Sequence, residues 1–154
     1  MYVRLVKLTI VLIGLHVLAG CASSGSSDFF KQAPEKDYSN MYLRGVFNWW
    51  EVNEAFKLLP STNDSRNDSY AVTIELIADG QPYDFKVADA DWTMTLNCGN
   101  EFGAVAMRLS GSVDLVCASD SLNLQFTPSE TAMYRFILDV SNNSEPELVI
   151  EKMD

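Results

Sequence analysis

The stretch 70-YAVTIELIADGQPYDFKVADADW-92 contains two segments in which apolar and polar residues alternate. Apolar side chains recur at every second position in residues 70–76, and Tyr, Phe and Val alternate with Asp and Lys in residues 83–87. A period of two is typical of a β-strand with one buried and one exposed face. The turn-forming sequence ADGQP lies between them, at residues 78–82. The stretch therefore predicts two strands joined by a tight connection.

The same alternation recurs toward the C-terminus, in residues 122–126 (LNLQF) and 134–140 (YRFILDV). Turn-forming sequences follow each of them, TPSE at 127–130 and SNNSEP at 141–146. Short strands at this spacing predict an all-β protein, an antiparallel β-sandwich. The pattern of residues 51–59 (EVNEAFKLL) fits either a short helix or a bulged strand.

The N-terminus has the organisation of a secretory signal. Residues 1–7 carry two basic side chains, residues 8–17 are apolar, and the sequence LAGC follows at residues 18–21. A transmembrane anchor is the alternative, but the apolar run is shorter than the roughly 20 residues that a membrane span needs. LAGC resembles the lipobox of bacterial lipoproteins, in which cleavage precedes a cysteine that is then acylated.

This resemblance implies that residues 1–20 are a lipoprotein signal peptide and that Cys21 carries the lipid, palmitate included. Acylation at several positions would hold the chain stably in a membrane. Ala22, and not Asp, follows the cysteine. By resemblance to the sorting rule of enterobacterial lipoproteins, this implies the outer membrane of a bacterial cell envelope. Residues 21–40 are rich in Ser, Gly and charge and predict a flexible linker, which leaves residues 41–154 as one domain.

The chain is acidic, with a formal net charge of −10. Loss of Arg4 and Lys7 with the signal would leave nine basic and 21 acidic residues, a charge of −12. Such a surface repels phosphate backbones, so we expect no nucleic acid partner. This charge neither favours nor disfavours the binding of a neutral ligand.

Acylation of Cys21 would leave Cys98 and Cys117 as an even pair in an oxidising compartment. We expect them to form a disulfide, which would contribute about 3 kcal/mol by closing the loop between them. Two buried thiols or a metal pair are the alternatives, although two cysteines without a nearby histidine make a poor zinc site.

The predicted mature chain lacks histidine, which many catalytic and metal sites use. The sole histidine, His16, lies in the predicted signal, which excludes Ser-His and Cys-His pairs and histidine-based metal sites from the mature chain. Asp89 and Asp91 could serve as an acid–base pair or bind calcium, but a solvated loop is their commoner role, and no EF-hand spacing is present. We therefore predict no catalytic residues, no metal and no cofactor: a binding or structural module, not an enzyme.

Five motifs follow one another in an order that resembles a known family. They look like the modules attached to bacterial pullulanases and related α-amylase-family enzymes, which are similar to the starch- and glycogen-binding modules of isoamylase type and of the AMP-activated kinase β-subunit. The resemblance covers nearly all of residues 41–152 and implies an early-set, immunoglobulin-like β-sandwich. The motifs are YLRGVFNWW (42–50), the stretch at 70–92, NCG (97–99), SLNLQF (121–126) and MYRFILDV (133–140).

Carried over motif by motif, the resemblance implies that Trp50, Lys86, Trp92 and Asn123 contact a glucan. Strand alternation independently puts Lys86 and Asn123 on the exposed faces of their strands. If the chain is extended at Trp49 and Trp50, these neighbours point to opposite faces, with Trp50 outward as the sugar platform. The family usually has Gly where this chain has Trp49, so Trp49 would redirect Trp50 or add a third aromatic contact.

Two functions from different classes follow. The first is a lipid-anchored module that binds α-1,4-glucan or maltodextrin, as in starch or glycogen, near a separate amylase-family enzyme or porin. The second is an interaction module that kept the sandwich, lost the sugar site and docks an envelope protein. Convergence of Trp50 and Trp92 on one exposed face would favour the first, and burial of both would remove its chemistry.

Overall fold

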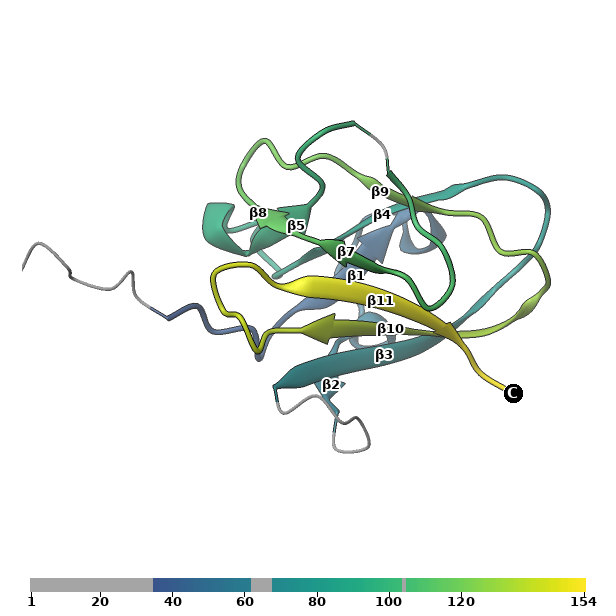
Figure 1. Cartoon of the computed structure of the whole chain (residues 1–154), viewed down its shortest axis with the longest axis horizontal. Helices are drawn as coiled ribbons and strands as arrows, with labels where there is room; N and C mark the ends of the chain where they lie inside the picture. Colours follow the sequence, from purple (N-terminus) through teal and green to yellow (C-terminus); the bar gives the residue numbers. More distant parts are fainter. Residues whose placement is uncertain (1–34, 62–67, 104) are drawn as a thin grey trace, which may run out of the picture. The chain divides into compact units, whose positions relative to one another are not determined.

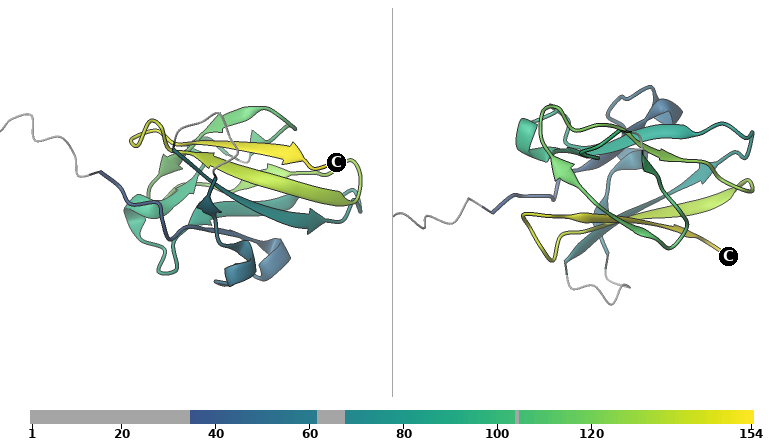
Figure 2. Two further views of the ribbon diagram at one scale, coloured as in Figure 1. Left: turned by 90° about the horizontal axis from the view of Figure 1, so that it is seen from below. Right: turned by 45° about the horizontal axis from the view of Figure 1, so that its top comes forward.

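The computed structural model describes residues 35–61, 68–103 and 105–154. The predicted signal peptide, Cys21 and most of the predicted linker lie outside the described residues. In the described part, two β-sheets pack face to face, which confirms the predicted immunoglobulin-like β-sandwich (Figures 1 and 2). No helix in this part is long and apolar enough to cross a membrane.

The first sheet has the strand order β6-β9-β4-β5-β8, and β1 pairs with β4 on its other side. The pairings are antiparallel except for the short parallel contact between β6 and β9. This sheet carries the residues of the functional site described below. Its strands are β1 (Tyr42–Gly45), β4 (Tyr83–Ala88), β5 (Asn97–Gly99), β6 (Val105–Ala106), β8 (Val116–Cys117) and β9 (Leu124–Phe126).

The second sheet is antiparallel throughout, in the order β2-β3-β10-β11-β7. Its longest pairing joins β3 and β10, from Ser69 opposite Asp139 to Leu76 opposite Ala132. Its strands are β2 (Leu59–Pro60), β3 (Ser69–Leu76), β7 (Ser112–Asp114), β10 (Ala132–Asp139) and β11 (Glu147–Lys152). The short 3-10 turns are η2 (Val46–Asn48), η3 (Glu54–Phe56) and η4 (Met94–Leu96).

The core lies between the sheets and is built from the apolar positions that the alternation predicted. Phe85 of β4 meets Phe136 of β10 edge to face, with ring centroids 5.3 Å apart. Leu122 is an exception: it was predicted to be buried, but it is exposed because it precedes β9 in a loop and pairs with Asn100. Buried members of the alternating segments include Val72, Ile74, Leu76, Val87, Leu124, Phe126, Tyr134 and Leu138.

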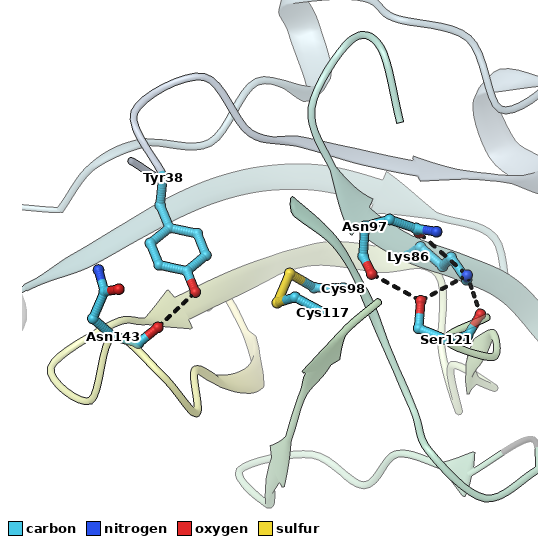
Figure 3. Close-up of a disulfide and its surroundings, with 7 residues drawn as sticks. All are labelled: Tyr38, Lys86, Asn97, Cys98, Cys117, Ser121 and Asn143. Atoms are coloured by element: carbon cyan, nitrogen blue, oxygen red, sulfur yellow. Dashed lines mark hydrogen bonds between the residues drawn. A yellow bond between two sulfur atoms is a disulfide. The ribbon is translucent and has the colours of Figure 1, made fainter. Parts of the chain in front are cut away.

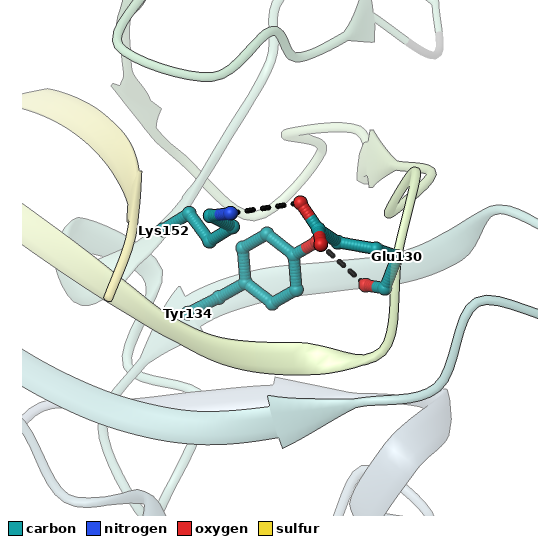
Figure 4. A network of polar contacts seen from close by, with 3 residues as sticks. All are labelled: Glu130, Tyr134 and Lys152. Carbon is teal, nitrogen blue, oxygen red and sulfur yellow. Dashed lines mark hydrogen bonds and ion pairs between the residues drawn. The ribbon is translucent and has the colours of Figure 1, made fainter. Parts of the chain in front are cut away.

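A polar contact joins the end of β11 to the turn that precedes β10 (Figure 4). Lys152 forms an ion pair with Glu130, with Nζ and Oε1 2.8 Å apart, and the Tyr134 hydroxyl donates to the Glu130 carbonyl oxygen at 2.7 Å. The Lys152 and Glu130 side chains are 36% and 58% exposed, so the ion pair itself contributes little. The buried Tyr134 ring and its hydrogen bond fix the start of β10.

Packed structure begins before Met41, where the domain boundary was predicted. Tyr38 is only 2% exposed and belongs to the core. Its hydroxyl donates to the Asn143 carbonyl oxygen at 2.8 Å, and Asn143 also bonds the backbone of Lys36 in both directions. The sequence-based boundary is therefore a few residues too late, because one aromatic side chain in a polar segment leaves no periodic pattern.

The ambiguous segment EVNEAFKLL is neither a regular helix nor a continuous strand. It forms η3 and then β2, and its buried side chain is Leu58 rather than Val52 or Leu59. Asn53 caps η3 by accepting a hydrogen bond from the Ala55 amide at 2.9 Å. A single turn is too short to generate a helical face, so the helical spacing in the sequence is coincidental.

Candidate functional site

A shallow hollow of about 570 Å³ lies on the outer face of the first sheet. Four of the five predicted ligand contacts line it, although they come from four different segments of the chain. Trp49 is absent from the lining and is instead 86% exposed. The lining residues are Trp50, Lys86, Trp92, Asn97, Ser119 and Asn123.

A second depression of about 600 Å³ lies elsewhere on the domain. It is formed by residues 35–38, 60–61 and 68–70 together with Val140 and Asn143. It contains none of the predicted contacts and no tryptophan. The hollow on the first sheet is therefore the one that holds predicted contacts and exposes two indoles.

Two indoles form one wall of the hollow. The ring centroids of Trp50 and Trp92 are 6.3 Å apart, and the ring planes are tilted by 39°. Trp92 is 36% exposed and Trp50 is half-buried, so neither belongs to the core. They converge on one exposed face, which is the arrangement that the sugar-binding hypothesis requires.

All three tryptophans have left-handed backbone conformations, with φ values of 54° at Trp49, 62° at Trp50 and 56° at Trp92. This region costs a residue with a side chain about 1–2 kcal/mol relative to its usual conformation. The prediction of an extended chain at Trp49 and Trp50 is therefore wrong. Trp50 does line the hollow, but a turn and not strand alternation places it there, and Trp49 is the more exposed of the two.

The turn that carries Trp50 is fixed by Asn48, which is buried at the end of η2. The Asn48 side chain accepts from the Gly45 amide at 2.9 Å and donates to the Leu43 carbonyl oxygen at 3.0 Å. The Trp50 amide also donates to the Gly45 carbonyl oxygen at 2.9 Å. Gly45 itself is required, because a Cβ there would lie 2.6 Å from the Asp84 carbonyl oxygen.

Arg44 of β1 packs against the Trp92 ring and is only 6% exposed. Its Nε and Nη2 donate to the Trp50 carbonyl oxygen at 2.9 and 2.5 Å, and its Nη1 donates to the carbonyl oxygens of Asp89 and Ala90 at 3.0 and 3.2 Å. Its Cζ lies 3.8 Å from the centroid of the Trp92 ring. Burial lowers the pKa of the Arg44 guanidinium, and the nearby Asp89 carboxylate acts in the opposite direction.

Lys86 of β4 lies in the floor of the hollow. Alternation predicted an exposed side chain; Lys86 does lie opposite the core residue Phe85, but it is only 8% exposed. Its ammonium donates to the Ser121 carbonyl oxygen, to Ser121 Oγ at 2.9 Å and to Asn97 Oδ1 at 3.2 Å (Figure 3). Burial lowers the pKa of Lys86, and Asp120 opposes this shift. Three acceptors engage its three N–H groups, so Lys86 holds the neighbouring loop in place.

The disulfide predicted from the cysteine count is present between Cys98 and Cys117 (Figure 3). The two residues are direct cross-strand partners on β5 and β8. Asn97 precedes Cys98, and its carbonyl oxygen accepts from the Ala118 amide at 3.0 Å and from Ser121 Oγ at 2.8 Å. The disulfide therefore joins the two segments that supply the polar wall of the hollow.

Gly99 allows the loop that carries Asn123 to approach the sheet. A Cβ at Gly99 would overlap the Leu122 carbonyl oxygen. Leu122 and Asn100 exchange backbone hydrogen bonds of 2.9 and 2.7 Å at this point. The close approach folds the loop over Lys86, which explains why that lysine is buried.

The sequence interpretation missed Arg44, Asn97, Ser119 and Ser121. The one available signal was Arg44, a charged residue between Leu43 and Gly45 in the motif at residues 42–50. The other three lie in or beside turns, where the sequence has no period that would show which way a side chain points.

Asp89 and Asp91 have no shared site. Asp89 Oδ1 accepts from the Thr93 amide at 2.8 Å and so closes the turn that carries Trp92, while Asp91 is exposed. Across the described residues, no group of three His, Cys, Asp or Glu side chains could hold a metal ion.

No family model matches this chain, and no curated protein matches it. A solved structure described as the ligand-induced structure of AmyP-SBD, a starch-binding domain, is similar, with a TM-score of 0.52. The match covers 100% of this chain and 95% of that chain at 14% sequence identity. At this identity the similarity shows a shared fold.

Proposed function

We propose that this protein binds α-glucan chains, such as starch, glycogen or maltodextrin, in the hollow on the first sheet and without catalysis. The observation that carries the proposal is the convergence of Trp50 and Trp92 on one exposed face. The fold shared with a starch-binding domain supports it.

The aromatic wall suits the apolar face of a pyranose ring. The C–H groups of a sugar can lie flat on an indole, which offers a large and rigid surface. Two indoles tilted by 39° suit a curved chain better than a flat one, because successive glucose units of an α-1,4-glucan rotate relative to one another. An amylose-like chain would therefore place neighbouring units on Trp50 and Trp92.

The opposite wall suits sugar hydroxyls. Asn97, Ser119 and Asn123 offer amide and hydroxyl groups that can both donate and accept hydrogen bonds. Lys86 supports this wall from below through Asn97 and Ser121 rather than by offering a free donor. The lining thus consists of indole, amide, hydroxyl and ammonium groups, whereas glycoside hydrolysis uses a pair of carboxyl groups that flank the bond.

The proposal includes anchoring through Cys21 in the bacterial envelope, on the outer membrane. A lipid anchor would keep bound glucan close to the cell surface, where a separate amylase-family enzyme or a porin could use it. The LAGC sequence supports this part of the proposal. Labelling of cells with a palmitate analogue tests it, because Cys21→Ser would abolish the label and a persistent label would exclude this anchor.

Retention on insoluble starch tests the glucan site. Wild-type protein is expected to co-sediment with starch granules and to be released by soluble maltodextrin, and Trp92→Ala is expected to stay in solution. Trp49→Ala is the matched control, because it removes an equally large ring that does not line the hollow. Retention of Trp92→Ala at the wild-type level, or no retention of wild type, would contradict the proposal.

A further inference from the structure

We infer that Arg44 is a positioning residue, whose guanidinium sets the distance and the tilt between the indoles of Trp50 and Trp92. Its importance for ligand binding rests on the proposed function. The positioning itself concerns the unliganded protein and is tested without a sugar.

One set of hydrogen bonds from Arg44 fixes the backbone of Trp50. Two N–H groups of Arg44 converge on the Trp50 carbonyl oxygen, at 2.9 and 2.5 Å. Trp50 has a left-handed backbone, and a residue with a side chain adopts this region only when neighbouring contacts compensate for its cost. The Arg44 bonds to this carbonyl oxygen supply such contacts.

A second set of contacts from Arg44 fixes Trp92. The remaining nitrogen of the guanidinium, Nη1, donates to the carbonyl oxygens of Asp89 and Ala90, in the turn just before Trp92. The guanidinium carbon also lies 3.8 Å from the Trp92 ring centroid, so the cation packs on the indole face. The turn and the ring are therefore attached to the same planar group that holds Trp50.

A guanidinium is suited to this role and an ammonium is not. The described partners of Arg44 are three carbonyl oxygens in two turns, and a planar fork with five donors in fixed directions can reach them together. Lysine keeps the charge, but it presents three donors at one point. Arg44→Lys would therefore leave at least one of these part-buried carbonyl groups without its partner and release one of the two turns.

The test uses circular dichroism of the unliganded protein. Two indoles with centroids 6.3 Å apart couple their electronic transitions, so wild type is expected to show a paired positive and negative band. This paired band is an exciton couplet. Trp50→Phe and Trp92→Phe each lack one of the two indoles, so their spectra show the complete loss of the couplet. Arg44→Lys is expected to lose most of this couplet, whereas Arg135→Lys, at a half-buried arginine of β10 that bonds Ser61, is expected to keep it.

Ligand binding gives the second readout. If wild type binds maltoheptaose, Arg44→Lys is expected to bind it at least about tenfold more weakly, the effect of losing one charge-assisted hydrogen bond. A lost couplet together with no binding by wild type would support the positioning and contradict the proposed function. A wild-type couplet and wild-type affinity in folded Arg44→Lys would overturn the positioning.

A measurement on wild type keeps the test valid if Arg44→Lys does not fold. Nuclear magnetic resonance detects scalar coupling across a hydrogen bond, here between Arg44 Nε and the carbonyl carbon of Trp50. We expect this coupling, together with slow solvent exchange of the Nε proton. Fast exchange without coupling would overturn the inference.

Discussion

Arg44 and Lys86 are direct cross-strand neighbours on β1 and β4, and both are buried on the outer face of the first sheet. Two like charges opposite each other disfavour a strand pair unless each is satisfied. Here Arg44 bonds the turns of the aromatic wall, and Lys86 bonds the loop of the polar wall. Both walls of the hollow are thus attached to adjacent positions of one rigid strand pair.

Lys86→Met tests whether Lys86 supports the loop or contacts the ligand. The variant keeps the apolar stem but removes the donors to Ser121 and Asn97. We expect the free energy of unfolding to fall by about 1–3 kcal/mol, because buried acceptors lose their partner. Urea unfolding without ligand measures this. Unchanged stability with weakened glucan binding would instead assign Lys86 a direct contact with the sugar.

Trp49→Gly tests the strain at the exposed tryptophan. Relief of the left-handed conformation, about 1–2 kcal/mol, exceeds the extra chain entropy of glycine, about 0.5–1 kcal/mol. Little burial is lost, since Trp49 is exposed. We expect the midpoint of urea unfolding to rise in Trp49→Gly but not in Trp49→Ala, which keeps the strain. A glycine variant less stable than the alanine variant would contradict this account.

Removal of the disulfide tests its link to the polar wall. The double variant Cys98→Ala/Cys117→Ala is expected to lose about 3 kcal/mol of stability, the typical contribution of a loop of this length. We also expect severalfold weaker glucan binding, because β5, which begins at Asn97, loses its cross-link to β8. Denaturant unfolding and a binding titration measure the two effects. Unchanged glucan affinity in the folded variant would show that the disulfide does not contribute to the geometry of the site.

Tyr38 gives the fold a dependence on alkaline pH. Burial raises the pKa of Tyr38 from 10.0 to about 12. A pKa that is higher in the folded state means that the unfolded chain ionises first. The stabilisation is therefore complete below pH 10.0 and is lost as the pH rises through about 12.

Phe at position 38 is the control for this pH dependence. Tyr38→Phe removes the ionisable group and its bond to Asn143, so its stability is expected to fall less between pH 10.0 and about 12. Urea unfolding across this range, with phenolate absorbance as a second signal, measures the difference. Parallel curves for both proteins would contradict a buried Tyr38.

The strands and the core were predictable because alternation records which face of a sheet is buried. Residues 70–76 follow this rule, and β3 and β10 pair along their length. In β10, Ile137 departs from it, because it is buried although it lies on the same face as Arg135 and Asp139. Tyr38 was not predictable in the same way, because a lone aromatic residue outside a periodic segment carries no register. The short turn η3 could not be predicted from the sequence either, since three residues do not make a helical face.

Four residues that line the hollow were predicted, but its other members and the way it is built were not. Trp50, Lys86, Trp92 and Asn123 were predicted from a resemblance, and they line one hollow. The predicted geometry at Trp49 and Trp50 is wrong because Asn48, Gly45 and Arg44 impose a turn through hydrogen bonds between residues close in sequence. The alternation of apolar and polar residues does not record such turn contacts, because it reports only which face of a strand is buried.

Titration of tryptophan fluorescence with maltoheptaose tests the central claim most directly. The account predicts a saturable change in wild type that is lost in Trp92→Ala and Trp50→Ala and is kept in Trp49→Ala, with all four proteins folded. A flat titration of folded wild type, or unchanged affinity in both hollow variants, would contradict the claim that Trp50 and Trp92 form a glucan platform.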